Sequence, residues 1–185
     1  MGFLELLLIA VSLAMDAFSV SVCGSLALAP SSRLAGALKF GVWFGVFQFL
    51  MPVIGYLTAY RAVEYIEAYD HWIAFFLLLY IGVNMIREAG EDAELIESYS
   101  VKRMFLLALA TSIDALAVGI SFAVLDVNIW TSSLLIGLVT FIISFVGGTI
   151  GFKLGERFRS HATCTGGLIL CLIGLKVLLE HTGYL

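Results

Sequence analysis

Apolar residues run almost without interruption through six long segments, and most charged residues lie between or at the ends of these segments. The segments are residues 3–29, 35–59, 72–86, 104–125, 130–152 and 163–179. Most approach the roughly 20 residues that a helix needs to cross a hydrocarbon core of about 30 Å. The pattern predicts an all-α integral membrane protein with six transmembrane helices.

The composition supports this prediction and excludes a soluble domain. Of the 185 residues, 61% are hydrophobic and 13% are charged, whereas soluble domains are only about half apolar. No Lys or Arg precedes Arg33, and the first apolar segment is too long for a signal peptide, so we expect it to remain as a span. The net charge of -4 comes largely from residues 87–103, an expected solvated loop with no sign of a nucleic-acid surface.

Three cysteines, Cys23, Cys164 and Cys171, lie inside the apolar segments. Their odd number and their position argue against a disulfide framework. We expect them to pack as small hydrophobic residues. The alternative, soft thiolate ligands for copper or zinc, would require the three to converge in space.

The two halves of the chain resemble each other. A shift of 98 residues superposes Asp16 on Asp114 and Val20 on Val118, and a shift of 92 superposes "IGVNMIRE" on "IGLKVLLE". A shift of 96 superposes four positions of the second segment on four of the fifth: Gly41, Gln48, Pro52 and Gly55 on Gly137, Ser144, Gly148 and Gly151. We predict one membrane domain, residues 1–185, made of repeat one (1–88), an acidic cytoplasmic loop (88–101) and repeat two (102–185).

Three spans per repeat is an odd number, so the second repeat would enter the membrane from the opposite side. This predicts an inverted repeat, as in many secondary transporters, with the substrate site near the midplane.

The basic residues are unevenly distributed between the two sides of the predicted membrane. One side of the predicted membrane carries Arg33, Lys39, Arg87, Lys102, Arg103, Lys153, Arg157 and Arg159, and the other carries Arg61, with Lys176 in or near the end of the last span. The positive-inside rule places both termini of this multi-pass plasma-membrane protein outside the cytoplasm.

Asp16 and Asp114 lie deep within predicted spans. They are roughly 18 Å and 15 Å along the helix from the starts of their spans, which is near the middle of the core. An ionised Asp there costs about 3 kcal/mol on insertion scales. Two such residues at equivalent positions favour a functional site. The alternative is that each is protonated and hydrogen-bonded to a neighbouring helix to hold the assembly together.

Small and polar residues accompany both aspartates. Residues on shared helix faces are Ser12, Asp16, Ser19 and Cys23 in span one, and Thr111, Asp114 and Ser121 in span four. We expect these two faces to look toward each other. Small-residue stripes are Gly41, Gly45, Gln48, Pro52 and Gly55, and Gly137, Thr140, Ser144, Gly147 and Gly151. The stripes predict close helix packing and leave an oligomer open as the alternative.

Pro52 predicts a kink that releases the Gln48 carbonyl, either to accept a ligand or to be satisfied by a hydroxyl group or water. Asp16, Asp114 and Gln48 are therefore candidate oxygen ligands for a hard divalent cation such as Mn²⁺ or Mg²⁺. Accessory candidates are Ser12, Ser19, Ser112, Ser144 and Asn84. The empty carboxyl pair should hold protons that metal binding expels, which predicts metal/proton exchange.

Two further side chains have alternative roles. Met15 is a soft ligand favouring manganese or simply a packing residue. Lys176 either pairs with Glu180 at the helix end or serves as counter-ion for an empty-site Asp.

These motifs resemble the MntP family of bacterial manganese efflux pumps. The resemblance rests on "SLAMDAFSVSV", "FGVFQFLMP" followed by "IGY", "HWIAFFLLLYIG" and "ATSIDALAVGISFAVLDVNI", and it covers nearly the whole chain. It implies export of Mn²⁺ as a transported substrate, no permanently bound cofactor, and Asp16 and Asp114 as the membrane-embedded aspartates of the family. Gln48 stands where an acidic residue occurs in some members, which would change the charge of the site.

Other functions fit parts of the pattern. One is an exporter of another divalent cation or a small cationic solute with the same architecture. A second is an intramembrane aspartyl protease, which also needs two facing aspartates, but its glycine-flanked "GxGD" pattern is absent. A third, a passive channel, would need a more hydrophilic lining. We therefore expect transport rather than enzymatic catalysis.

Overall fold

The computed structural model describes residues 2–26, 28–66, 98–125 and 127–181, and isolated positions between 75 and 86. Its elements are α1 (Phe3–Ser25), the short 3₁₀ helix η1 (Pro30–Ser32), α2 (Arg33–Ile66), α4 (Val101–Ala110), α5 (Ile113–Val124) and α6 (Ile129–His181). The all-α prediction is confirmed for these residues. The predicted third span and the acidic loop lie almost entirely outside the described residues.

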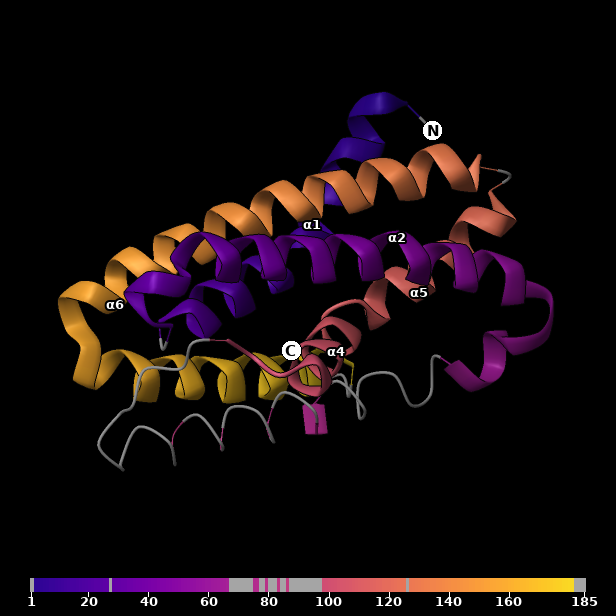
Figure 1. The fold of residues 1–185 in the computed structure, drawn as a ribbon. Helices are drawn as coiled ribbons and strands as arrows, with labels where there is room; N and C mark the ends of the chain where they lie inside the picture. The colour runs from indigo at the N-terminus through magenta and orange to yellow at the C-terminus, as the bar shows by residue number, and fades with distance from the viewer. Residues whose placement is uncertain are drawn as a thin grey trace.

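Three described helical segments are long and apolar enough to cross a membrane: Phe3–Ser25, Arg33–Ala59 and Ile129–Lys153. They coincide with the predicted first, second and fifth spans. The predicted fourth span is a bent pair, α4 and α5, whose axes differ by 47°. The predicted sixth span lies within the second half of α6. Figure 1 shows α6 turning sharply, so that its yellow second half runs back below the orange first half.

Exposed apolar side chains form a continuous face on the long helices. On α2 they recur at steps of three or four residues, as expected for one face of a helix. They are Leu34, Leu38, Val42, Val46, Leu50, Ile54 and Leu57 on α2, and Trp130, Leu134, Leu138, Ile142, Val146 and Ile150 on α6. Apolar surface of this extent is typical of contact with another apolar phase rather than water.

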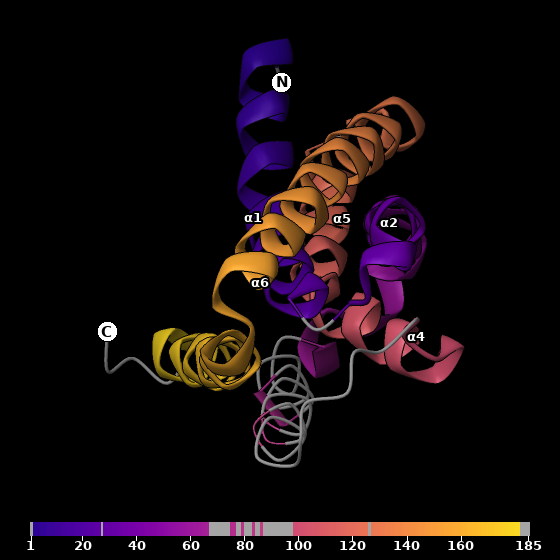
Figure 2. The same cartoon turned by 60° about the vertical axis from the view of Figure 1, so that its left-hand side comes forward.

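The helices pack crosswise between the two halves of the chain. α1 packs along α6, α5 packs along α2, and α2 lies beside the first half of α6 (Figures 1 and 2). At the crossing of α2 and α6, a Cβ added at Gly45 would lie 2.9 Å from the Gly137 carbonyl oxygen. Glycine is therefore needed there for the two backbones to come this close.

Two other close approaches occur at equivalent positions of the halves. A Cβ at Gly55 of α2 would collide with the carbonyl group of Leu116 and contact the Ile120 nitrogen of α5. A Cβ at Gly151 of α6 would collide with the Val22 carbonyl oxygen of α1. Gly151 is Gly55 shifted by 96 residues, and Ile120 is Val22 shifted by 98. The α2–α5 and α1–α6 contacts therefore involve equivalent glycines and equivalent helices, although the carbonyl that each Cβ would strike differs by one helical turn, since Leu116 is the equivalent of Phe18 and not of Val22.

The buried apolar residues form two clusters. The first cluster includes Ala17, Val20, Phe40, Phe44, Met104, Leu107 and Ala108. The second cluster includes Ala10, Ala115 and Ile136, with Leu6, Ile9 and Val118 packed against it. The same shifts relate them: Ala17 to Ala115, Val20 to Val118, Phe40 to Ile136, Leu6 to Met104, Ile9 to Leu107 and Ala10 to Ala108. Each cluster combines elements from both halves of the chain.

Candidate metal site at a broken helix

The break between α4 and α5 falls two residues before Asp114. α4 ends at Ala110, Thr111 caps it, and α5 begins at Ile113. The hydroxyls of Thr111 and Ser112 donate to the carbonyls of Leu107 (3.1 Å) and Ala108 (2.7 Å). The Leu107 carbonyl also accepts from the Thr111 amide, whereas the Ser112 amide donates to Leu109, so the Ser112 hydroxyl bonds to the Ala108 carbonyl at the end of the helix. Sequence reasoning missed the break because no Gly or Pro marks it; the adjacent Thr-Ser pair is the signal that was available.

Asp114 lies in the first turn of α5, and its carboxylate Oδ1 accepts a hydrogen bond from the Ala115 amide at 2.8 Å. The positive end of a helix dipole stabilises a negative charge at this position. The break therefore lowers the cost of an ionised carboxylate. The side chain is exposed rather than enclosed in either apolar cluster.

Asp16 has a different setting, because α1 continues unbroken through it. Its side chain is half-buried, and the neighbouring Met15 is 48% exposed. Ser19 donates its hydroxyl to the Met15 carbonyl at 2.9 Å. Ser12, one turn before Asp16, is exposed. Asp16 therefore lies on a partly exposed face of α1 that carries both polar and apolar side chains.

Gln48 connects the two aspartate-bearing segments. Its side chain, 0% exposed on α2, donates from Nε2 to the Leu13 carbonyl at 3.3 Å and the Thr111 carbonyl at 2.9 Å. Both acceptors lie three residues before an aspartate and are related by the shift of 98 residues. Because both distances end on one nitrogen, the separation of the two carbonyl oxygens cannot exceed the sum of these distances, about 6.2 Å. Gln48 Oε1 is buried and has no hydrogen-bond partner among the described residues.

The other predicted site residues differ in burial. Ser112 and Ser144 are fully buried, whereas Ser12 is exposed and Ser19 half-buried.

The prediction that Thr111, Asp114 and Ser121 share one helix face is wrong, since the break separates Thr111 from the helix that carries the other two. Asn84 and the side chain of Lys176 lie outside the described residues.

The described residues contain no group of three or more His, Cys, Asp or Glu that could hold a metal ion. A cation bound between the aspartate-bearing segments would therefore draw on amide, hydroxyl or carbonyl oxygens as well as carboxylates. Such oxygen ligands suit hard cations such as Mn²⁺ and Mg²⁺. Cys23 is a buried free thiol in the first cluster, which agrees with packing as a small hydrophobic residue.

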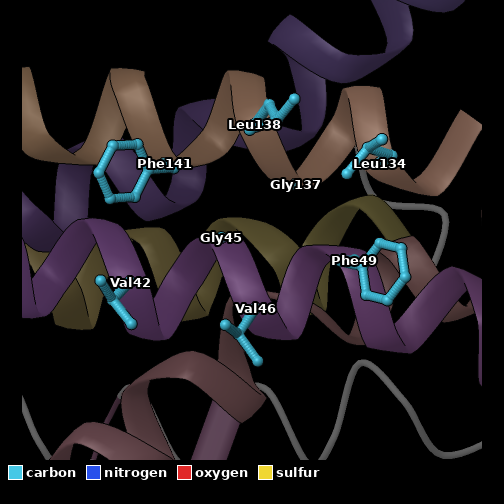
Figure 3. A pocket seen from close by; sticks show the side chains of 8 residues that line it. All are labelled: Val42, Gly45, Val46, Phe49, Leu134, Gly137, Leu138 and Phe141. Carbon is cyan, nitrogen blue, oxygen red and sulfur yellow. The ribbon is translucent and has the colours of Figure 1, made fainter.

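An apolar groove lies between α2 and α6. It has a volume of about 250 Å³, and Figure 3 shows its lining: Val42, Gly45, Val46, Phe49, Leu134, Gly137, Leu138 and Phe141. None of these side chains offers an oxygen or nitrogen ligand. This groove is therefore not a candidate ion site.

Comparison with known proteins shows the family of the chain. Residues 31–178 match the family described as "Putative manganese efflux pump". The chain belongs to the MntP family. No solved structure matches the chain.

Similar members of the MntP family come from bacteria and an archaeon, and each is named "Putative manganese efflux pump MntP". The Desulfitobacterium hafniense protein is 52% identical, covering 100% of this chain and 98% of its own. The Mannheimia succiniciproducens protein is 47% identical over 98% of each chain. The Methanothermobacter thermautotrophicus protein is 47% identical over 100% of each. The resemblance therefore extends along the whole chain.

The Gln48 bridge in this MntP family member should contribute measurably to stability. Gln48→Leu keeps a similar volume but removes both hydrogen bonds, so we expect a loss of about 1–2 kcal/mol. This corresponds to a fall in Tm of roughly 2–8 °C in a thermal-shift measurement in detergent. The matched control is Ser144→Ala at the repeat-equivalent position, whose hydroxyl has no partner among the described residues. Its Tm should be unchanged or higher; an equal fall in both variants would contradict the bridge.

Proposed function

We propose that this chain exports Mn²⁺ from the cytoplasm through a site between Asp16 and Asp114. The observation that carries the proposal is the Gln48 side chain, which bonds to equivalent carbonyls of the two aspartate-bearing segments. One buried nitrogen thus holds the two segments together three residues before each acid. Family membership supports manganese as the substrate, because the similar relatives are named for manganese efflux.

We further propose an inverted repeat of six transmembrane helices. The matched contacts of Gly55 with Ile120 and of Gly151 with Val22 support it, as do the two equivalent apolar clusters. In this arrangement both termini lie outside the cytoplasm and residues 88–101 form a cytoplasmic loop. The substrate site then lies near the midplane, where the two repeats meet.

The chemistry of the site follows from its charges. Two ionised carboxylates neutralise a divalent cation, and Gln48 Oε1 is a buried oxygen available as a further ligand. The hydroxyls of Ser12, Ser19, Ser112 and Ser144, and the Asn84 side chain, are the accessory candidates. When the site is empty, protons reduce the cost of keeping two acids in a medium of low dielectric constant. Metal binding displaces these protons, which couples Mn²⁺ export to proton import.

Transport by purified protein in vesicles tests this proposal. With an acidic vesicle interior, protons leave as Mn²⁺ enters, so a manganese-sensitive dye inside should report an initial rate at least about tenfold above that without a gradient. An ionophore that collapses the pH gradient should abolish the increase. The matched control is the same preparation carrying both Asp16→Asn and Asp114→Asn.

Different results overturn different parts of the proposal. Manganese entry that is indifferent to the pH gradient would remove the proton coupling. Entry of Mg²⁺, Zn²⁺ or a basic amino acid without any entry of Mn²⁺ would reassign the substrate. Cleavage of added membrane-spanning peptides, lost on Asp114→Asn, would favour a protease instead.

A further inference from the structure

Three hydroxyl side chains on α6 are buried without hydrogen-bond partners among the described residues. Ser133, Thr140 and Ser144 are each 0% exposed, and the hydroxyl oxygen of each has no partner there. Buried polar groups are nearly always hydrogen-bonded, so three exceptions on one helix require an explanation.

Other hydroxyls in these helices are satisfied by their own backbone. Ser21 donates to the Ala17 carbonyl at 2.7 Å, Ser112 to Ala108 at 2.7 Å, and Thr149 to Phe145 at 3.0 Å. This local bond is the usual solution for Ser and Thr in a membrane helix. The three α6 hydroxyls do not use it, although they lie in a regular helix.

The three residues form a row along one face of α6, here called the α6 hydroxyl row. They are separated by seven and four positions, so at about 100° per residue they lie within about 40° of one another, over a length of about 16 Å. Gly137 and Gly151 share this face, and they contact α2 and α1 respectively. The row therefore faces the junction of α1 and α2, from which Gln48 reaches Leu13 and Thr111. Gln48 Oε1 is a fourth buried oxygen without a described partner.

The row has no counterpart in the other half of the chain. The shift of 96 residues relates Ser133, Thr140 and Ser144 to Ala37, Phe44 and Gln48. Phe44 is 0% exposed and packs against Phe40 with ring centroids 5.8 Å apart. The buried face of α2 thus carries an aromatic ring, that of Phe44, where the equivalent face of α6 carries the hydroxyl of Thr140. The two halves of the chain therefore differ at these positions, although their apolar clusters are related by the same shifts.

We propose that the α6 hydroxyl row lines the path along which a hydrated divalent cation leaves the site toward the outside. This inference rests on the proposed function and on its inverted topology. The row begins four residues into α6, at the predicted outer surface, and ends at the repeat-equivalent of Gln48. Its oxygens exchange hydrogen bonds with the water that accompanies the ion. Phe40 and Phe44 close the equivalent path toward the cytoplasm while this one hydrates.

Cysteine accessibility tests the path without depending on transport. Cys23, Cys164 and Cys171 are first replaced by Ala, and Ser133→Cys, Thr140→Cys and Phe44→Cys are then made singly in the full-length protein. Intact cells are treated with a small, charged, membrane-impermeant methanethiosulfonate reagent. We expect Ser133→Cys and Thr140→Cys to react at least tenfold faster than Leu138→Cys, a matched control that is 52% exposed on the apolar face of α6. Phe44→Cys should react no faster than Leu138→Cys.

A second measurement asks whether the path carries the ion. Thr140→Val and Ser144→Ala keep the side-chain shape and remove the hydroxyl, so manganese efflux should fall at least tenfold in the double variant, with no fall in Tm. Leu138→Ala should leave efflux unchanged.

The outcomes separate this inference from the proposed function. Labelling of Thr140→Cys at the rate of Leu138→Cys, in cells that export manganese normally, would overturn the path and leave the function intact. Labelling only from the cytoplasmic side would overturn its direction. Rapid labelling from outside in a protein that transports no manganese would sustain the hydrated path and overturn the proposed function.

Discussion

Asp16→Asn and Asp114→Asn should each reduce manganese efflux at least about 100-fold, because each removes a full negative charge from the proposed binding site of a doubly charged ion. In a medium of low dielectric constant, the lost attraction exceeds the roughly 2.7 kcal/mol that a factor of 100 represents. Folding should survive both changes. At Asp114, the Asn side chain retains an oxygen that can accept the Ala115 amide bond. At Asp16, the substitution removes a charge that is costly within a membrane helix.

The matched control for the aspartates is Glu5→Gln. Glu5 also lies in the first turn of a helix, is exposed, and accepts a hydrogen bond from a backbone amide, that of Gly2, at 2.9 Å. It lies near the start of α1, away from Gln48 and the break. Manganese accumulation in an exporter-deficient strain and initial rates in vesicles measure the effect. Export by Asp16→Asn or Asp114→Asn at the rate of Glu5→Gln would show that these carboxylates are not needed for transport.

Much of the architecture could be predicted because it depends on periodic properties of the chain. Hydropathy predicted the three described spans, since an apolar run of the right length has few alternatives to a membrane helix. The internal shifts of 96 and 98 residues predicted which positions would be equivalent. In the structure, the carbonyls of Leu13 and Thr111, which are related by one of these shifts, both accept a hydrogen bond from Gln48 Nε2.

The break at Thr111 and Ser112 could not be predicted in the same way. The hydropathy pattern does not reveal this break, because Thr and Ser in membrane helices usually bond to their own backbone without ending the helix. The bonds at the break are those of the Thr111 and Ser112 hydroxyls and a tertiary bond from Gln48, 63 residues away, to the Thr111 carbonyl. The tertiary bond alone does not end a helix, because the Leu13 carbonyl also accepts from Gln48 and α1 remains continuous. The two halves differ in that the equivalents of Thr111 and Ser112 in α1 are Leu13 and Ala14, which have no hydroxyl.

The α6 hydroxyl row shows what the internal sequence repeat does not predict. The small-residue stripe on the fifth span included Thr140 and Ser144, and its predicted role was close packing. Gly137 and Gly151 on the same face bear this out through their contacts with α2 and α1. The unpartnered state of the hydroxyls depends on which neighbours they meet, and only the three-dimensional arrangement gives this. Equivalent positions therefore predicted the shared scaffold, whereas the differences between them, such as Phe44 and Thr140, required the structure.

Gly55→Ala and Gly151→Ala should each destabilise the protein by about 1–3 kcal/mol, a fall in Tm of roughly 2–12 °C. At each position the new methyl group would collide with a backbone carbonyl, of Leu116 or of Val22, which cannot rotate away as a side chain can. The helices would have to separate, α2 from α5 in one variant and α1 from α6 in the other. The matched control is Gly36→Ala, where the methyl group would meet only the end of the flexible Leu28 side chain.

Comparing these two variants also tests the repeat itself. If the two halves share one packing geometry, Gly55→Ala and Gly151→Ala should lower Tm by similar amounts, both clearly more than Gly36→Ala, in thermal unfolding followed in the same detergent. A large effect at Gly55 with none at Gly151 would mean that the α1–α6 contact is not equivalent to the α2–α5 contact. In that case the shared sequence pattern would not correspond to shared packing, and the proposed inverted repeat would lose the support of these contacts.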